Sequence, residues 1–480
     1  METIWDHAIL ETFAIGIPDS GLEDERLQEI DARTEHYGNM MFIIENVKNK
    51  NWDGVLTFYK NKDGPVNVRI TSTGETVLHM AVRDRELEAL EKLTEKVEME
   101  LADNRGNTCL HLAAKMGYTD GCIFLAKNKP DRIRNCNSDN ETPLFLAALY
   151  GREETFFVLA QICDNVYGHD ITYEYGRRGS DGSTVLHCAI NEDFFDLACS
   201  IMYRYPEFVH RVDQRGYSPL HLLACKTSSF RSCSRFTWLQ QIIDSSVPDG
   251  NSWVRKVVES RLDRTANSNG VWKRMGFLLI QIVEVLEMKE REQKSIKIME
   301  FILREFKRYN ILDANPQVTP RVMMFLTSTK FDTRVSLETS QRNRTEQETP
   351  ILVASKNGIT EIVRGILEQF SEAIYDVNSE GKNVMLLAVE HRQPQVYGTL
   401  LKHVEKSTKD MLYHNDNDGN NALHLAAIAN TYRSWFASNT VLQMQWEINW
   451  FEFVAIANTY RSWFASNAVL QMQWEINWFE

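Results

Sequence analysis

Apolar and polar positions recur in a fixed order along this chain. In the copy from Asp103 to Gly117, a polar turn precedes the apolar run Thr-x-Leu-His-x-Ala-Ala. Leu110, Ala113 and Ala114 in that run fall on one helical face, because residues three or four apart share a face. The pattern therefore predicts a short helix that begins after the turn and buries one apolar side.

Further copies of this pattern show that it is a repeated unit. The residue in the turn position of each copy lies at 74, 106, 140, 182, 216, 347, 381 and 419. Most successive starts lie 32 to 42 residues apart, and one gap spans 131 residues. A single unit cannot bury its own apolar side, so we expect the units to stack. We interpret the longer step before Gly182 as an extended loop rather than a lost repeat.

Each position in the unit has a local structural role. Glycine in the turn slot adopts positive φ without a Cβ clash, as expected for Gly106, Gly182, Gly216, Gly381 and Gly419. A hydroxyl residue follows as the predicted helix N-cap, at Thr76, Thr108, Thr142, Thr184, Ser218 and Thr349. Proline occupies the first helical position in three copies, at Pro143, Pro219 and Pro350. The same residue types recur at the same positions across the copies, which strengthens the prediction of a turn followed by a capped helix.

The repeated unit resembles the ankyrin repeat, which has a period of about 33 residues and a Thr-Pro-Leu-His-x-Ala signature. The predicted fold is therefore an all-α ankyrin-repeat solenoid of helix pairs with β-hairpin loops, in two repeat blocks separated by a helical insertion. The expected segments are a flexible arm at 1–35, capping helices at 36–70, repeats at 71–245, the insertion at 246–312, a linker at 313–346, repeats at 347–454 and a Trp-rich tail at 455–480.

The insertion differs from the rest of the chain in charge. The net charge is -13, yet residues 226–344 carry 21 basic and 13 acidic side chains. The 131-residue gap could conceal degenerate repeats, but its helical stripes favour an insertion. The basic segment either lies against the acidic repeats or meets anionic lipid or an acidic partner, and we favour the first. The acidic balance of the whole chain argues against a nucleic acid partner.

The sequence of the tail is almost identical to that of the segment before it. Residues 455–480 copy residues 427–452, with Ala468 in place of Thr440. We expect the first copy to form the closing helix, with Leu442, Trp446, Trp450 and Phe453 inward. The second copy could self-associate or touch a membrane surface, and the simpler interpretation is a sequence artefact or a loosely packed helix.

Residues able to carry catalysis or bind metal do not form a known motif. The eight cysteines include no Cys-x-x-Cys pair and suggest reduced thiols in a cytosolic setting. The recurrent histidines occupy one slot in different repeats, so we expect hydrogen bonds between repeats rather than a metal site; they are His79, His111, His187, His221 and His424. The stretch His414 to Gly419 lacks the oxygen ligands of a calcium loop at its first and last positions. We predict no enzyme activity, cofactor or metal.

Binding residues are expected at the hairpin tips and the exposed start of each inner helix, which form a concave face for a protein partner. In the second repeat these are Asn104, Arg105, Asn107, Lys115, Met116 and Tyr118. In the third they are Ser138, Asp139, Glu141, Tyr150 and Arg152, and in the fifth Gln214, Arg215 and Tyr217.

Several stretches of residues 40–454 resemble the plant ankyrin-repeat proteins that end in a membrane domain with a Pro-Gly-Gly motif. They are Glu141 to Gly151, Leu186 to Ile190, Ser218 to Ala224 with Ser229 to Ser232, Asn383 to Pro394, and Leu442 to Glu447. The resemblance implies a repeat region at the cytoplasmic face of the plasma membrane, with a role in stress or defence signalling. The sequence lacks the Pro-Gly-Gly motif and a spanning segment, so we expect a cytoplasmic protein as it stands.

The function expected from these features is a protein-interaction scaffold without catalysis. The alternative is a membrane-associated signalling or transport regulator whose spanning domain is truncated here. The possible membrane contacts are the basic insertion and the Trp-rich tail.

Overall fold

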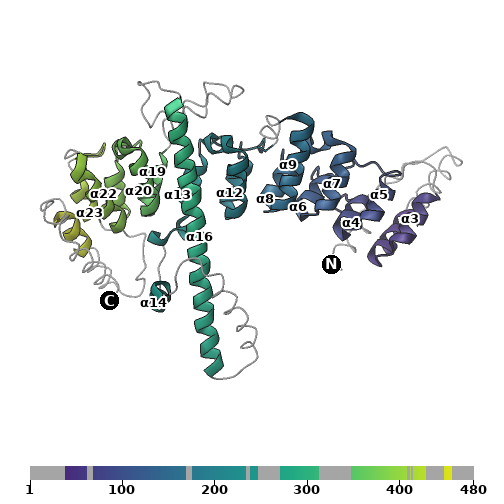
Figure 1. Cartoon of the computed structure of the whole chain (residues 1–480), viewed down its shortest axis with the longest axis horizontal. Coiled ribbons are helices and arrows are strands. Elements are labelled where there is room, and N and C mark those ends of the chain that lie inside the picture. Colours follow the sequence, from purple (N-terminus) through teal and green to yellow (C-terminus); the bar gives the residue numbers. More distant parts are fainter. Residues whose placement is uncertain are drawn as a thin grey trace, which may run out of the picture. The chain divides into compact units, whose positions relative to one another are not determined.

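The computed structural model describes residues 38–61, 69–168, 176–233, 238–246, 271–312, 348–407, 411, 414–428 and 448–456. Each repeat contributes an inner helix and, in most cases, an outer helix that returns beside it (Figure 1). Six inner helices start at the predicted N-caps, and those of the last two repeats start at Asn383 and Asn421. The inner helices are α4 (Val77–Asp84), α6 (Cys109–Met116), α8 (Pro143–Leu149), α11 (Val185–Asn191), α13 (Pro219–Cys225), α19 (Pro350–Asn357), α21 (Val384–Glu390) and α23 (Ala422–Ala427). The outer helices are α5 (Leu87–Leu93), α7 (Thr119–Asn128), α9 (Glu153–Tyr167), α12 (Phe195–Arg204), α20 (Thr360–Gln369) and α22 (Pro394–Ser407).

Helix α6 shows why these residues form these elements. Gly106 adopts a φ of 76° in the turn, and Thr108 is the N-cap of the helix. Gly117 ends α6 in the left-handed conformation, which glycine adopts without a Cβ penalty. Inside the helix, Leu110, Ala113 and Ala114 are buried, so the apolar side predicted from the sequence is the packed side. The predicted N-caps and turn glycines are confirmed in the other repeats.

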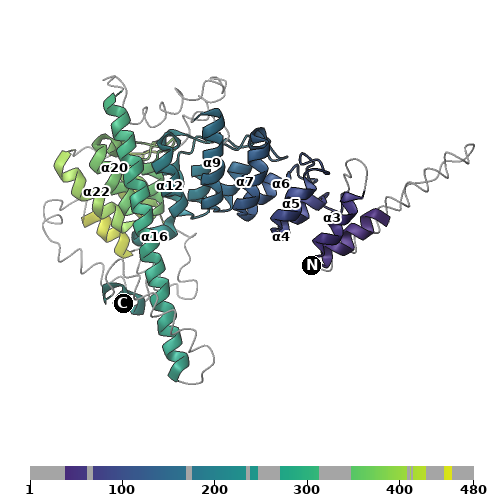
Figure 2. The same ribbon diagram turned by 45° about the vertical axis from the view of Figure 1, so that its right-hand side comes forward.

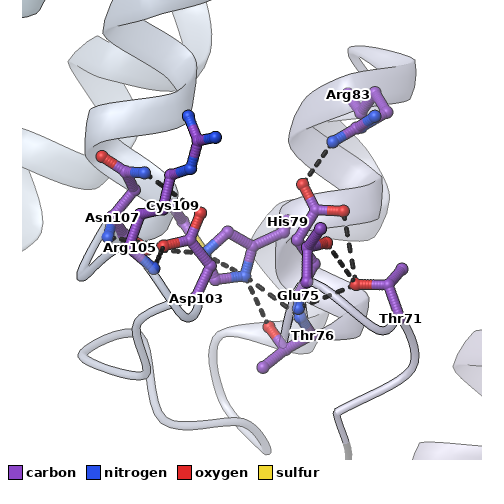
Figure 3. A network of polar contacts seen from close by, with 10 residues as sticks. Thr71, Glu75, Thr76, His79, Arg83, Asp103, Arg105, Asn107 and Cys109 are labelled. Atoms are coloured by element: carbon purple, nitrogen blue, oxygen red, sulfur yellow. Dashed lines mark hydrogen bonds and ion pairs between the residues drawn. The ribbon is translucent and has the colours of Figure 1, made fainter. Parts of the chain in front are cut away.

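Histidine side chains join one repeat to the next (Figure 3). The backbone N–H of Thr76 donates to Nδ1 of His79 at 3.2 Å, so Nδ1 carries no proton and Nε2 must carry one. Nε2 of His79 then donates to the carbonyl oxygen of Asn107 in the next repeat at 3.0 Å. The expected bond between repeats is therefore confirmed here. His111 makes the equivalent bond to the carbonyl of Glu141, at 3.2 Å.

Burial keeps these imidazoles neutral. Desolvation lowers the pKa of His79, and it lowers that of His111 to about 4, although the backbone carbonyl of Asn107 or Glu141 opposes the shift. Cys109 lies beside the His79 ring, and burial raises the pKa of its thiol to about 12. These side chains therefore serve packing and hydrogen bonding in their neutral forms.

The contacts divide the chain into two units, residues 1–197 and 198–480, with the boundary inside α12. In the first unit, the inner helices α4, α6, α8 and α11 stack in order, and α3 (Trp52–Lys60), α5, α7 and α9 stack in a second row. The helix at residues 38–48 and α3 occupy the segment predicted as capping helices. Since α11 packs directly on α8, no repeat is missing at the 42-residue step.

In the second unit, the fifth and sixth repeats stack on each other although 131 residues separate their turns. Helix α13 packs against α19, and Nε2 of His221 contacts the carbonyl oxygen of Glu348 at 3.1 Å. The side chain of Asn357 also donates to the carbonyl oxygen of Ala224 at 2.9 Å. The repeats on either side of the insertion therefore join by the same type of bond that links sequential repeats.

Most of the described insertion is one long helix, α16 (Val271–Leu312), which packs against α13 and α20. One stripe of α16 is buried, at positions i, i+3, i+4, i+7 and i+11, and it consists of Ser295, Ile298, Met299, Ile302 and Phe306. In the described residues, no outer helix directly follows α13, and this part of α16 lies beside α20, an outer helix of the next repeat. The C-terminal half of α16 thus acts as the outer helix of the fifth repeat, a role that the predicted separate insertion does not include.

The N-terminal part of α16 extends past helices α19 to α22 in both views of the second unit (Figures 1 and 2). Helix α14 (Trp238–Ser246), expected among the repeats, packs against α16 instead. Lys289 on α16 donates to the carbonyl oxygen of Asp244 at 2.7 Å and lies 3.2 Å from its carboxylate. Arg231 also pairs with Asp244, so this carboxylate fastens α14 to α16.

The last described helix, residues 448–456, covers α22. Trp450 and Phe453 are buried and contact the ring of Tyr397 edge to face, with ring centroids 6.2 Å and 5.9 Å from it. The inward positions predicted for these two residues are confirmed. Leu442 and Trp446, the arm at 1–35, the linker at 313–346 and most of the second tail copy lie outside the described residues. No helix among the described residues has an apolar stretch of membrane-spanning length.

The buried histidines predict that acid destabilises the first unit. In the folded state the pKa of His111 is about 4, whereas an unfolded histidine titrates near 6.5. Below pH 6.5 the unfolded state therefore binds a proton that the folded state excludes, and stability falls until about pH 4. For His111 alone this difference is on the order of 3 kcal/mol.

Urea unfolding of the wild type and of His111→Gln at several pH values between 6.5 and 4 checks this expectation. Glutamine does not titrate, so the variant should be less stable at neutral pH but lose less stability on acidification. Since the carboxylates are common to both proteins, equal pH dependence would contradict the assignment.

Packing between α16 and α20 predicts a steric effect at Gly365. A Cβ atom at Gly365 would lie 3.0 Å from Cε of Met299 and 3.2 Å from Cδ1 of Leu303. Gly365→Leu should therefore lower the free energy of unfolding by about 1–3 kcal/mol through overpacking. Gly365→Ala, which needs only a small shift of the flexible Met299 end, should be close to neutral because alanine favours helix. Urea unfolding measures both, and Met299→Ala should partly rescue the leucine variant; equal losses without rescue would contradict this packing.

Candidate functional site

The predicted binding residues fall into three groups by exposure. Eight are exposed: Asn104, Arg105, Ser138, Asp139, Tyr150, Arg152, Gln214 and Arg215. Four are half-buried: Asn107, Lys115, Met116 and Tyr217. Two are buried, Tyr118 at 6% and Glu141 at 7% exposure. The exposed and half-buried residues therefore remain available as a surface, whereas the last two do not.

Tyr118 and Glu141 serve the packing of adjacent repeats. The Tyr118 hydroxyl donates to the carbonyl oxygen of Arg85 at 3.3 Å, and burial raises the pKa of this hydroxyl, with the charges of Asp120 and Glu86 adding to the effect. The Glu141 carboxylate lies 2.8 Å from the guanidinium of Arg178 in the next hairpin. These contacts cross repeat boundaries, which explains why the position of each residue within its own repeat did not reveal them.

The hairpin tips are fixed by bonds along the row of turns. The side chain of Asn104 donates to the carbonyl oxygen of Ser72 at 3.0 Å, and its oxygen accepts from Arg69 at 3.1 Å. Asn107 is held by the carboxylate of Asp103, which accepts from its backbone N–H at 2.8 Å and from its side chain at 3.1 Å. The tips therefore form a preorganised edge rather than a set of independent loops.

Arg105 differs from Asn104 and Asn107 because, in the described part of the chain, no hydrogen bond holds its side chain. Its backbone N–H donates to Asp103 at 2.8 Å, and its carbonyl accepts from Ser138 of the next hairpin at 2.9 Å. Among the described residues, its guanidinium has no ion-pair partner. In the adjacent repeat, by contrast, Arg83 is paired with Glu75 (Figure 3). The backbone of Arg105 is thus anchored while its charge is available.

A second exposed cluster lies where α6 ends. The ammonium of Lys115 lies 4.8 Å from the ring centroid of Tyr150, a cation–π distance, and Tyr150 is 40% exposed. Nε of Arg152 donates to the carbonyl oxygen of Lys115 at 3.2 Å. The structure therefore brings together three of the predicted residues from two consecutive repeats.

Arg85, which is not among the binding residues predicted from the sequence, also belongs to this cluster. Its guanidinium donates to the carbonyl oxygen of Met116 at 3.2 Å and lies 5.9 Å from the Tyr118 ring. Arg85 occupies the slot that Gly117 fills in the next repeat, and it adopts a φ of 60° there. An arginine in a slot that holds glycine in the next repeat was the sequence signal that could have identified it.

Gln214, Arg215 and Tyr217 belong to the second unit. Arg215 pairs with Asp213 at 3.3 Å and stacks over the Tyr217 ring at 5.5 Å. Asp213 also accepts the backbone N–H of Tyr217 at 2.8 Å, which closes the turn. This hairpin has an exposed surface of its own, and we treat it separately from the residues of the first unit.

The described residues contain no group of three histidine, cysteine, aspartate or glutamate side chains placed to hold a metal ion. The stretch from His414 to Gly419 is a hairpin turn: Asp416 accepts the backbone N–H groups of Asp418 at 3.0 Å and Asn420 at 2.7 Å. The Nε2 atom of His414 contacts the carbonyl oxygen of Gly381 at 2.7 Å. These oxygen and nitrogen atoms thus take part in the packing of the repeats.

Comparison with known protein families identifies the repeats between residues 44 and 172. A family model described as ankyrin repeats (3 copies) matches residues 44–134 and 78–172. No curated protein matches the chain. The matched residues include the stacked pairs α4 to α9, in which the Thr-x-Leu-His histidines bond to the next repeat. The chain carries ankyrin repeats, and its fold is an all-α ankyrin-repeat solenoid.

Proposed function

We propose that this chain is a protein-interaction scaffold without catalysis, and that a protein partner binds the exposed hairpin tips and inner-helix ends of the first unit. The observation that supports this most is the contrast between fixed backbone and exposed side chains. The carbonyl of Arg105 accepts from Ser138 of the next hairpin, and the turn at Tyr150 is joined to the preceding repeat through Arg152, so little conformational entropy is lost when a partner binds.

The composition of this surface also suits a protein partner. Arginine and tyrosine dominate the energetics of many protein interfaces, and here Arg105, Tyr150 and Arg152 lie on consecutive repeats. Ankyrin repeats generally mediate protein binding, which agrees with this interpretation. A role in stress or defence signalling rests on the family resemblance alone. The alternative of a membrane-associated regulator rests on that resemblance and on the basic insertion and the Trp-rich tail as possible membrane contacts.

A combined Arg105→Ala, Tyr150→Ala and Arg152→Ala variant tests the proposal. We expect it to lose binding partners that the wild type captures, because each substitution removes an exposed group from the surface and only Arg152 makes a bond between repeats. The measurement is quantitative mass spectrometry of proteins cross-linked to the full chain in an extract of the source cells.

The matched control carries three alanines on outer-helix surfaces, at Lys60, Glu91 and Lys127, which are exposed and distant in sequence from the turns. Thermal unfolding should show that both variants are folded. If the surface variant retains every partner of the wild type, binding does not use these residues and the proposed site is wrong.

A further inference from the structure

We propose that the end of α6 binds an acidic segment of the partner protein, through a basic cluster formed by Arg85, Lys115 and Arg152. The inference rests on the proposed protein-binding function and adds the chemical class of the bound segment. It also adds Arg85, which lies outside the surface predicted from the sequence.

The three cations converge because they share one helix end. Arg85 donates to the carbonyl oxygen of Met116, and Arg152 donates to that of Lys115, each at 3.2 Å. These are the last two residues of α6, so guanidinium groups from the preceding and following repeats meet at successive carbonyls. The ammonium of Lys115 belongs to the same turn. The carbonyl end of a helix carries partial negative charge, which favours cations there.

No carboxylate neutralises the cluster within the part of the chain that the structure describes. The contacts of Arg85 and Arg152 are to backbone carbonyls and, for Arg85, an aromatic ring, and Lys115 lies against the Tyr150 ring. Elsewhere in the first unit, cations of the same type do have acidic partners, as Arg83 has Glu75 and Arg178 has Glu141. The three cations of the cluster therefore have no ion-pair partner among the described residues.

The contacts that hold the cluster also limit its mobility. A Cβ on Gly117 would lie 2.8 Å from Cδ of Arg152, so the glycine lets the arginine side chain cross the turn. Tyr150 holds Lys115 and, at 40% exposure, offers part of its ring to a ligand. A carboxylate approaching the cluster would find cations already in place, which lowers the entropic cost of forming the ion pairs.

Charge outside the cluster favours a peptide over nucleic acid or anionic lipid. The whole chain has a net charge of -13, which repels an extended polyanion. Glu86 and Asp120 lie near the Tyr118 hydroxyl, at the edge of the cluster, and would repel charge that continues beyond it. A short acidic segment satisfies the three cations without meeting these carboxylates, and a basic residue flanking the segment could pair with them.

Selection of displayed random peptides on the full-length chain tests the inference. We expect the enriched peptides to contain clusters of Asp and Glu, and synthetic versions with Asn and Gln in their place to bind at least about tenfold more weakly. A combined Arg85→Gln, Lys115→Gln and Arg152→Gln variant should weaken the acidic peptides by a similar factor, while glutamine can still donate to the backbone carbonyls. Raising the salt concentration should reduce the wild-type affinity more than that of the variant.

The matched control, Lys60→Gln, Lys96→Gln and Lys127→Gln, removes the same charge elsewhere in the first unit and should bind like the wild type. If the triple cluster variant unfolds, the single Lys115→Glu variant replaces it, because the Lys115 ammonium makes no hydrogen bond to the backbone that would be lost. Binding by either cluster variant equal to that of the wild type overturns the inference.

The outcomes separate this inference from the proposed function. Enriched peptides without acidic residues, bound at the Arg105 and Tyr150 surface, overturn the acidic class and leave the scaffold function standing. Absence of any enriched peptide counts against both. Tighter binding to single-stranded nucleic acid or to vesicles of anionic lipid than to the acidic peptides would assign the cluster to another class of ligand.

Discussion

A polar contact from the first turn of an inner helix to the next repeat is the interaction on which this fold depends, and in several repeats a neutral imidazole makes it as a hydrogen bond to a carbonyl. That hydrogen bond requires that Nδ1 of the histidine accept the N–H of the N-cap residue, because only that tautomer leaves Nε2 as a donor. The same atoms therefore start a helix and fix its neighbour, so local and long-range structure are specified together. Where the bond joins His221 to Glu348, it fixes the register of two repeats although the insertion separates them. A buried donor without that carbonyl would be costly, which makes the stacking specific as well as favourable.

Repeats without the histidine replace this bond with other polar contacts. In the third repeat Phe145 occupies the slot, and the guanidinium of Arg178 lies 4.9 Å from its ring while pairing with Glu141. In the sixth, the Thr349 hydroxyl donates to the carboxylate of Asp376 at 2.6 Å. In the seventh, the Asn383 side chain donates to the carbonyl oxygen of Met411 at 3.1 Å. Each substitute joins the first turn of an inner helix to the next hairpin, so the constraint is the bond between repeats rather than the imidazole itself.

The sequence predicts the features that depend on residues close together in the chain. Thr108 as an N-cap and Gly106 at positive φ follow from residue type and spacing, and the structure has both. The outer-helix role of α16 was not predicted, because the insertion separates that helix from α13 in the sequence. The short distance that normally separates the inner and outer helices of one repeat is therefore absent. The burial of Tyr118 and Glu141 was missed for a related reason, since the contacts that bury them come from neighbouring repeats. The position of a residue within its repeat thus predicts where its backbone lies, but not which residues of the adjacent repeat bury its side chain.

The surface near α6 shows how a repeat fold can concentrate charge without a sequence motif. Arg85 and Arg152 lie 67 residues apart, one on each side of the repeat that contains Lys115, yet stacking brings both guanidinium groups to one helix end. The free carbonyls at that end need donors, and long arginine side chains from the two neighbouring turns supply them. Because the carbonyls are neutral, they satisfy hydrogen bonds and leave the charge uncancelled, in contrast to the carboxylate that neutralises Arg83. A binding surface of this kind arises because the carbonyls at a helix end need hydrogen-bond donors. The surface is positively charged because arginines supply those donors here, whereas at the end of α19 the neutral amide of Gln393 supplies one.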